Sequence, residues 1–145
     1  MTDWVLLLGG STGHGAATAK RLAKDGYGII AFHFDRGEAK KIAEETIAEV
    51  NETTDGRCHY FNTNAAAVET MDAYIPKINE ITDGQPVKLL LHSIAFGTTT
   101  NFFGEKPVTQ KQMDMTVHVM GNSLLYWTQK LFATDLLGKG SRVMG

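Results

Sequence analysis

The hydrophobic positions of this chain follow two alternating patterns: short apolar runs, and longer stretches in which apolar residues recur every few positions. A short, unbroken apolar run is typical of a strand that is buried on both faces of a sheet. Such runs predict strands at Val5–Leu8, 28–34 (GIIAFHF), 58–62 (CHYFN) and 87–97 (VKLLLHSIAFG, a strand that runs into a loop), and 140–145 (GSRVMG) opens a fifth.

The stretches between these runs have the spacing of amphipathic helices. They predict helices at Gly13–Lys24, 37–50, Val68–Ile81 and Val117–Leu137. Gly26 is expected to end the first helix, since glycine readily adopts the left-handed conformation that follows many helices. Pro76 predicts a kink or a split in the third, because its nitrogen cannot donate the hydrogen bond of a helix interior.

The order of these elements predicts the fold class. Strands that alternate with helices need crossover connections, which build a parallel sheet with helices on both faces. We therefore expect an α/β fold, a Rossmann-type doubly wound parallel sheet that is truncated at about the fifth strand. The length of 145 residues suits one domain, residues 1–145.

Composition and charge narrow the classes of function. Hydrophobic and charged fractions of 43% and 21% are those of a globular protein. A net charge of −2 gives no electrostatic reason to expect nucleic acid or an anionic membrane surface as a partner. The N-terminus has no basic leader and its apolar run is too short to span a membrane, so we expect a cytoplasmic protein. The single cysteine, Cys58, excludes an internal disulfide, fits a reducing compartment and is interpreted as an ordinary strand residue.

A cluster of glycines marks the candidate site. The loop between the first strand and the first helix reads Gly9-Gly10-Ser11-Thr12-Gly13-His14-Gly15. The amides at a helix N-terminus lack partners inside the helix and attract anions, and glycine lets a phosphate approach the backbone closely. The spacing is not G-x-G-x-x-G. Its place between a buried strand and an amphipathic helix nevertheless favours dinucleotide binding over a merely structural turn.

The G-x-x-x-G-x-G spacing resembles the short-chain dehydrogenase/reductase family, which binds NAD(H) or NADP(H). Within that family, LLLHSIAFG (89–97) is similar to the segment of enoyl-acyl-carrier-protein reductases in which the fourth strand ends in His-Ser-Ile-Gly/Ala. His118 falls where the wider family places a helical Asn and where enoyl reductases can have His. The glycine loop, by contrast, has the commoner dehydrogenase form rather than the variant of many enoyl reductases.

The resemblance implies roles for individual residues. Gly9, Gly13 and Gly15 should face the pyrophosphate, and Ser11 and Thr12 should lie near the adenosine ribose or phosphate. The remaining contacts should come from loops that follow strands: Asn64 and Ala65 at the adenine, and Ser93, Ile94 and Ala95 at the nicotinamide ribose.

The choice of cofactor depends on the residues that follow the second strand. An acidic side chain there accepts a hydrogen bond from the ribose 2′-hydroxyl, and a basic one pairs with a 2′-phosphate. His33 occupies the usual position of the discriminating Asp, and Arg36 lies where some NADPH-using relatives have Arg. Asp35 could serve NAD(H) or could cap the next helix. The pattern favours NADP(H) over NAD(H).

The family's reaction needs a Tyr and a Lys. Tyr126 and Lys130 have the Tyr-x-x-x-Lys spacing, but they precede the fifth strand, whereas the family's pair follows it. We therefore interpret them as structural and expect no catalytic residue in this span; His118 is the one candidate for a role in proton transfer. No His, Cys or carboxylate cluster has the spacing of a metal site. The catalytic helix is expected beyond Gly145, in a longer enzyme of which residues 1–145 are the N-terminal part.

These residues and the resemblance together predict an NAD(P)H-dependent oxidoreductase of acyl thioesters. The first hypothesis is enoyl-acyl-carrier-protein reductase in fatty acid synthesis, which delivers hydride to the β-carbon of a 2-enoyl group. The alternatives are a 3-oxoacyl or other carbonyl reductase of the same family, and a non-catalytic nucleotide-binding protein. Segment 97–116 is expected on the substrate side, where Phe96, Phe102 and Phe103 either contact an acyl chain or belong to the core. A homotetramer is the expected assembly.

Overall fold

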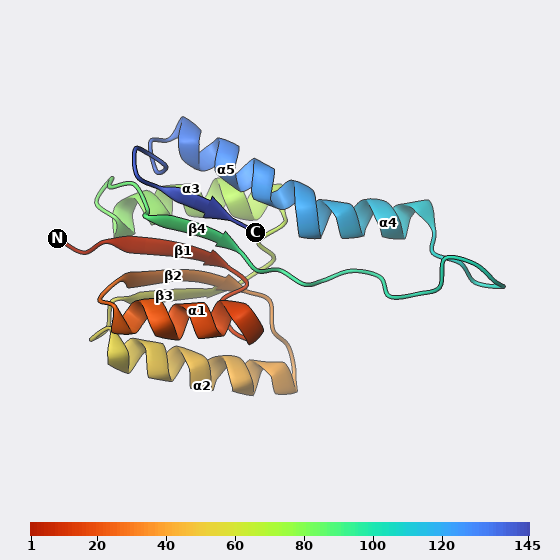
Figure 1. Cartoon of the computed structure of the whole chain (residues 1–145), viewed down its shortest axis with the longest axis horizontal. Coiled ribbons are helices and arrows are strands. Elements are labelled where there is room, and N and C mark those ends of the chain that lie inside the picture. Colours follow the sequence, from red (N-terminus) through yellow and green to blue (C-terminus); the bar gives the residue numbers. More distant parts are fainter.

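The computed structural model describes residues 1–145 and contains one parallel sheet with the strand order β3-β2-β1-β4-β5 (Figure 1). Its strands are β1 (Trp4–Leu8), β2 (Gly28–His33), β3 (Cys58–Asn62), β4 (Leu89–His92) and β5 (Arg142–Met144). Helices α1 (Gly13–Lys24) and α2 (Glu38–Thr53) cover one face, and α3 (Val68–Ile81) and α5 (Ser123–Ala133) cover the other (Figure 1). The predicted doubly wound α/β fold is confirmed.

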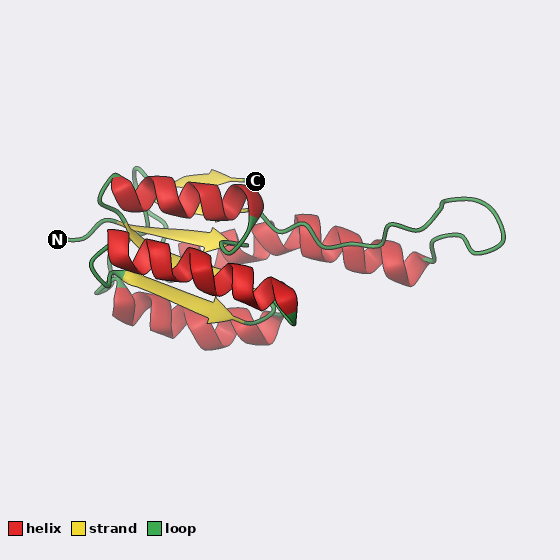
Figure 2. Cartoon of the chain, turned by 90° about the horizontal axis from the view of Figure 1, so that it is seen from below, coloured by secondary structure: helices red, strands yellow, loops and turns green.

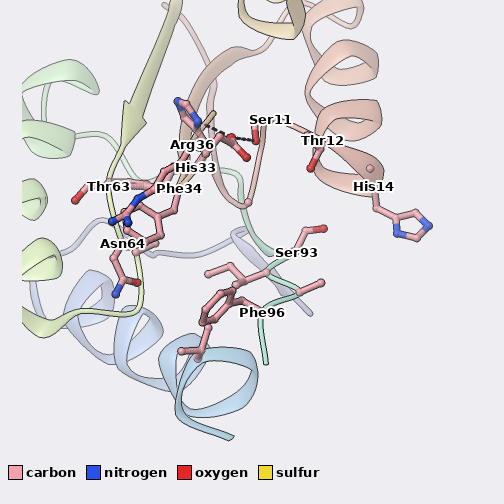
Figure 3. A pocket seen from close by; sticks show the side chains of 18 of the residues that line it. Ser11, Thr12, His14, His33, Phe34, Arg36, Thr63, Asn64, Ser93 and Phe96 are labelled. Carbon is pink, nitrogen blue, oxygen red and sulfur yellow. Dashed lines mark hydrogen bonds and ion pairs between the residues drawn. The ribbon is translucent and has the colours of Figure 1, made fainter. Parts of the chain in front are cut away.

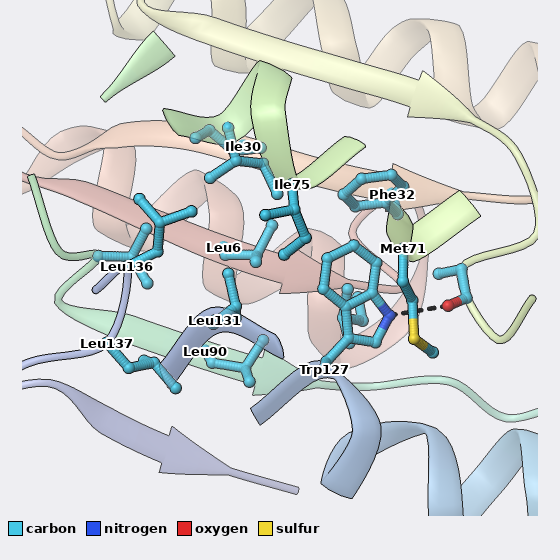
Figure 4. Packing of buried hydrophobic residues seen from close by; sticks show 14 residues of the cluster. Leu6, Ile30, Phe32, Met71, Ile75, Leu90, Trp127, Leu131, Leu136 and Leu137 are labelled. Atoms are coloured by element: carbon cyan, nitrogen blue, oxygen red, sulfur yellow. Dashed lines mark hydrogen bonds between the residues drawn. The ribbon is translucent and has the colours of Figure 1, made fainter. Parts of the chain in front are cut away.

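The alternation of side chains along β1 and β2 builds a core on each face of the sheet, because successive strand residues point in opposite directions. The larger core, on the α3 and α5 side, takes the even-numbered residues Leu6, Leu8, Ile30 and Phe32 (Figure 4). The core beneath α1 and α2 takes the odd-numbered residues Val5, Leu7, Ile29 and Ala31. Both strands therefore carry apolar residues on both faces, up to the polar His33 at the end of β2, which is why they read as continuous apolar runs.

The long helix differs from its predicted bounds of Val117–Leu137. It is continuous from Gln110 to Ala133 and consists of α4 (Gln110–Val117), a π-helical turn η1 (His118–Asn122) and α5. Its start is fixed by a capping box, in which Thr109 and Gln112 bond each other's backbone N–H groups. No residue of α4 is buried, so this part lacks the core-facing apolar stripe by which a helix is recognised in the sequence. Figure 2 shows α4 and the loop before it extending away from the sheet.

Two local predictions concern helix ends and breaks. Gly26, with a φ of +90°, follows the end of α1 as predicted. Pro76 does not split α3, which is helical from Val68 to Ile81. The proline lies on the exposed side of the helix, where water can bond the carbonyl group that it leaves without a donor. None of the helices combines the length and the apolarity needed to cross a bilayer.

Candidate functional site

A cavity of about 630 Å³ opens at the carboxyl ends of the strands (Figure 3). It lies where the chain order of the sheet reverses, between β1 and β4, the usual place for a ligand in a doubly wound sheet. The loops that follow β1, β2, β3 and β4 line it, together with two residues of the long helix, Met115 and Val119. A volume of this size falls within the range of roughly 300–1,000 Å³ that is typical of small-molecule sites.

The glycine loop supplies a row of free amide groups to this cavity. The N–H groups of Gly9 and Gly10 both donate to the carbonyl oxygen of Phe32, which anchors the start of the loop on β2. The next five N–H groups, from Ser11 to Gly15, have no backbone acceptor, and α1 has no acidic residue in its first turn. Unpaired amides at the positive end of a helix dipole form an anion site, so the loop fits a diphosphate.

The glycines allow this loop to lie close to its neighbours. A Cβ atom on Gly9 would lie 2.3 Å from the carbonyl oxygen of Ser93, and one on Gly15 would lie 1.7 Å from the carbonyl oxygen of Gly9. Gly9 and Gly13 also have φ angles of +92° and +54°, a region that favours glycine. Gly9 and Gly13 line the cavity, as do Ser11 and Thr12, whereas Gly15 lies behind the loop and lets α1 approach β1.

The residues after β2 form a polar cluster with the glycine loop (Figure 3). The Ser11 hydroxyl donates to Oδ2 of Asp35 at 2.6 Å, and Nδ1 of His33 donates to the same oxygen at 2.8 Å. The guanidinium of Arg36 lies 4.7 Å from the centre of the Phe34 ring. The alternative in which Asp35 caps the next helix is wrong: the N-cap of α2 is Gly37, and the Asp35 side chain turns back to Ser11.

The loops after β3 and β4 complete the cavity. Asn64 and Ala65 follow β3, and Ser93, Ile94 and Ala95 follow β4; all five line the cavity. The N–H of Ser93 donates to the carbonyl oxygen of Leu8 at 2.7 Å, so the loop after β4 continues the ladder with β1. Residues that the sequence analysis did not assign to the cofactor also line the cavity. They are His14, Phe32, Phe34, Asp35, Thr63, Phe96, Met115 and Val119.

Most of these additional residues adjoin an assigned position, so their place in a loop after a strand could have indicated them. Met115 and Val119 are the exceptions. They belong to the long helix, and only its packing brings them to the cavity.

Two polar side chains, the buried His92 and the half-buried Tyr60, lie beside the loops that line the cavity. Nε2 of His92, the last residue of β4, donates to the Ser123 hydroxyl at 2.8 Å, and that hydroxyl donates to the carbonyl oxygen of Val119. Burial lowers the pKa of His92, so the neutral ring is favoured. Burial also raises the pKa of Tyr60, and the charge of Cys58 adds to this effect. Tyr60 therefore stays a neutral phenol, with its hydroxyl 3.5 Å from the carbonyl oxygen of Gly10.

The other candidates for chemistry lie outside the cavity. Lys130 forms an ion pair with Asp72 of α3, and neither Lys130 nor Tyr126 lines the cavity. His118 is half-buried and does not line it either; its Nε2 donates to the carbonyl oxygen of Ala66 at 2.8 Å. No three His, Cys, Asp or Glu side chains gather closely enough to hold a metal ion.

Comparisons with known proteins agree with this arrangement. The sequence pattern of the family described as short chain dehydrogenase matches residues 3–143. No curated protein matches the sequence significantly. Among solved structures, a short-chain dehydrogenase/reductase from Serratia marcescens has a TM-score of 0.76 and 21% sequence identity, over 97% of this chain and 53% of its own. A short chain dehydrogenase from Bacillus anthracis has a TM-score of 0.73 and 18% identity, over 89% of this chain and 49% of its own.

A 3-oxoacyl-[acyl-carrier protein] reductase from Brucella melitensis in complex with NAD is similar as well. Its TM-score is 0.75 and its identity 20%, over 98% of this chain and 52% of its own. This chain thus spans about half the length of the solved structures that it matches. At these identities the structures show the fold, and the family pattern over residues 3–143 shows the family. The chain belongs to the short-chain dehydrogenase family, whose members are NAD(P)-dependent oxidoreductases.

Proposed function

We propose that the protein carrying this chain is an NAD(P)H-dependent oxidoreductase of acyl thioesters, and that 2-enoyl thioesters of acyl carrier protein are its substrates. The observation that carries the proposal is the row of N–H groups from Ser11 to Gly15, which have no acceptor in the chain and border a cavity of about 630 Å³. The reduced dinucleotide, when bound, supplies the hydride.

Different residues around the cavity would bind different parts of the cofactor. The amides of Ser11–Gly15 would hold the diphosphate, and Asn64 and Ala65 the adenine. Ser93, Ile94 and Ala95, which continue from β4, would line the nicotinamide ribose. This assignment keeps the charged diphosphate at the positive end of α1 and the less polar rings in the loops on either side.

The polar cluster after β2 supports NADP(H) over NAD(H). Arg36 is exposed at the cavity and forms no ion pair with a carboxylate of this chain, so its charge is available to a 2′-phosphate. Asp35 already accepts hydrogen bonds from Ser11 and His33, which compete with a ribose 2′-hydroxyl for the carboxylate. The Brucella structure in complex with NAD keeps NAD(H) as the alternative to test.

The choice of substrate rests on two observations. The segment His92-Ser93-Ile94-Ala95 at the end of β4, which resembles that of enoyl reductases, supports a 2-enoyl substrate. The likeness to the Brucella 3-oxoacyl-[acyl-carrier protein] reductase supports the 3-oxoacyl alternative. In either case Phe96, which is exposed and lines the cavity, offers an apolar surface to an acyl chain.

Exposed apolar side chains of the long helix support an assembly of copies of this chain. Large apolar side chains are exposed along it, namely Met113, Val117, Met120, Leu125 and Phe132. Large apolar side chains such as Met and Phe are enriched at protein interfaces. We expect a homotetramer, and the single free cysteine is consistent with a place in the cytoplasm.

Two variants of Gly13 test the anion site. Asparagine and aspartate both tolerate a positive φ, and a Cβ atom at Gly13 meets no atom within 4 Å. Gly13→Asp and Gly13→Asn therefore add side chains of equal size that differ in charge. We expect Gly13→Asp to bind NADPH about tenfold more weakly than Gly13→Asn, because the carboxylate repels the diphosphate. Equal affinities, measured by NADPH fluorescence, would refute the anion site.

Turnover separates the remaining possibilities. The intact protein is assayed with crotonyl and acetoacetyl thioesters, with NADPH and with NADH. Reduction of the crotonyl thioester supports the enoyl reductase, and reduction of the acetoacetyl thioester alone supports the 3-oxoacyl reductase. Binding of NADPH without turnover of either substrate would favour a non-catalytic nucleotide-binding protein.

A further inference from the structure

Two side chains of the long helix hold the loop that follows β3. Nε1 of Trp127 donates to the carbonyl oxygen of Ala65 at 2.7 Å (Figure 4), and Nε2 of His118 donates to that of Ala66 at 2.8 Å. Both alanines are buried, so these carbonyl groups depend on protein donors rather than on bulk water. The helix thus holds two consecutive carbonyl groups of one loop.

The same loop orients Asn64. The N–H of Ala66 donates to Oδ1 of Asn64 at 3.0 Å, which turns the carboxamide oxygen toward the loop. The side-chain NH2 group of Asn64 has no acceptor in the chain, and Asn64 is exposed and lines the cavity. The orientation of this NH2 group therefore depends on where the backbone of Ala66 lies.

We propose that His118 is a positioning residue for the cofactor: it holds Ala66 in place and thereby aims Asn64 at the adenine. One hydrogen bond joins His118 to the carbonyl group of Ala66, and one more joins the N–H of the same residue to Asn64. The proposal rests on the proposed function, since it assumes that the cavity binds a dinucleotide with its adenine at Asn64.

The helix around His118 is placed for such a role. Met115 and Val119, on either side of it in the sequence, line the cavity, while His118 itself stays outside the lining. A proton-transfer role would require contact with the cavity, which the structure does not show for this side chain. Trp127 also holds the loop, but its side chain is fully buried in the core. His118 is half-buried and can be changed with less damage to the fold.

The test compares three substitutions in the intact protein. His118→Leu removes the donor, His118→Gln keeps an N–H donor at a similar reach, and His118→Asn keeps one that is too short. Tyr126→Phe is the matched control on the same helix, since the Tyr126 hydroxyl makes no hydrogen bond in the chain and its ring lies 6.0 Å from that of His118. Each variant is titrated with AMP, with reduced nicotinamide mononucleotide and with NADPH, and its thermal unfolding is recorded.

We expect His118→Leu and His118→Asn to weaken AMP and NADPH binding about fivefold, the usual effect of one lost hydrogen bond. The affinity for reduced nicotinamide mononucleotide should be unchanged, because that half of the cofactor does not reach Asn64. His118→Gln and Tyr126→Phe should bind all three ligands as the wild type does. In an Asn64→Ala background the His118 substitutions should have no further effect on AMP binding.

Other results would overturn the inference. A merely structural role would weaken AMP and nicotinamide mononucleotide binding equally, together with a lower unfolding temperature. Unchanged AMP binding in His118→Leu would also contradict it. If His118→Leu does not fold, equal AMP affinities of His118→Gln and His118→Asn would refute the inference. A wild type that binds neither AMP nor NADPH would instead refute the proposed function itself.

Discussion

Gly15 offers a sharp test of how α1 meets the sheet. In Gly15→Ala the new Cβ atom would lie 1.7 Å from the carbonyl oxygen of Gly9, where real Cβ atoms keep at least 3.0 Å. That oxygen belongs to a backbone held in place, since the N–H of Gly9 donates to Phe32 at 2.9 Å. The N-terminus of α1 must therefore move away from the loop by more than an ångström.

The magnitude follows from two opposing effects. Alanine in place of glycine stabilises a helix by roughly 0.5–1 kcal/mol. Overpacking costs about 1–3 kcal/mol and more where backbone must shift. We expect a net loss of about 2 kcal/mol, or roughly 6 °C in unfolding temperature for a chain of this size. Because the displaced residues carry the free amides of Ser11–Gly15, NADPH affinity should also fall at least tenfold.

Gly121→Ala is the matched control. Gly121 lies in the η1 turn of the long helix, and a Cβ atom there meets nothing within 4 Å. This variant should be as stable as the wild type or about 0.5 kcal/mol more stable, with unchanged NADPH binding. Urea unfolding monitored by circular dichroism and NADPH fluorescence measure both effects. A Gly15→Ala variant as stable as Gly121→Ala, and binding NADPH normally, would refute the close contact between α1 and the glycine loop.

Four further predictions concern charge, burial and pH. Arg36→Ala should weaken NADPH binding about tenfold and leave NADH binding unchanged; a parallel loss for both cofactors in fluorescence titrations would contradict a 2′-phosphate contact. Asp35→Asn removes a negative charge from the same place and should favour NADPH over NADH in the same titrations. Trp127→Phe leaves the buried carbonyl group of Ala65 without its donor and should cost about 1–3 kcal/mol in urea unfolding, whereas an unchanged stability would mean that water replaces the indole. The pKa of His92 lies below its ordinary value of 6.5 in the folded state, so the unfolded chain binds more protons in this range. Stability should therefore decrease as the pH falls through 6.5, and less so in His92→Gln; an equal decrease in both would assign the effect to other groups.

Much of the fold follows from local patterns. The apolar runs locate all five strands, most clearly β1 and β2, because a strand that is covered on both faces takes apolar residues on both. The bounds of α1 and α3 agree with their predicted ranges, since their apolar spacing and ends are visible in the sequence. The start of the long helix was missed, because α4 projects from the body and buries none of its residues.

The candidate site, like the fold, could be predicted from the sequence only in part. The residues assigned from the resemblance line the cavity apart from Gly15, since they follow strands whose carboxyl ends share one edge of a parallel sheet. Met115 and Val119 could not be found, because helical spacing does not tell which side of α4 and η1 faces the cavity. The roles of the lining residues toward a cofactor remain predictions for the experiments above.

By itself, the sequence determined the doubly wound sheet and the position of the glycine loop, because hydrophobic periodicity and the conformational freedom of glycine act within a few residues. Only the tertiary structure decided which polar groups pair across the site. Ser11 meets Asp35 across 24 positions, and His118 and Trp127 reach the loop of Asn64 across 52 and 62. Such pairings depend on how whole elements pack against one another, and no local spacing encodes that geometry.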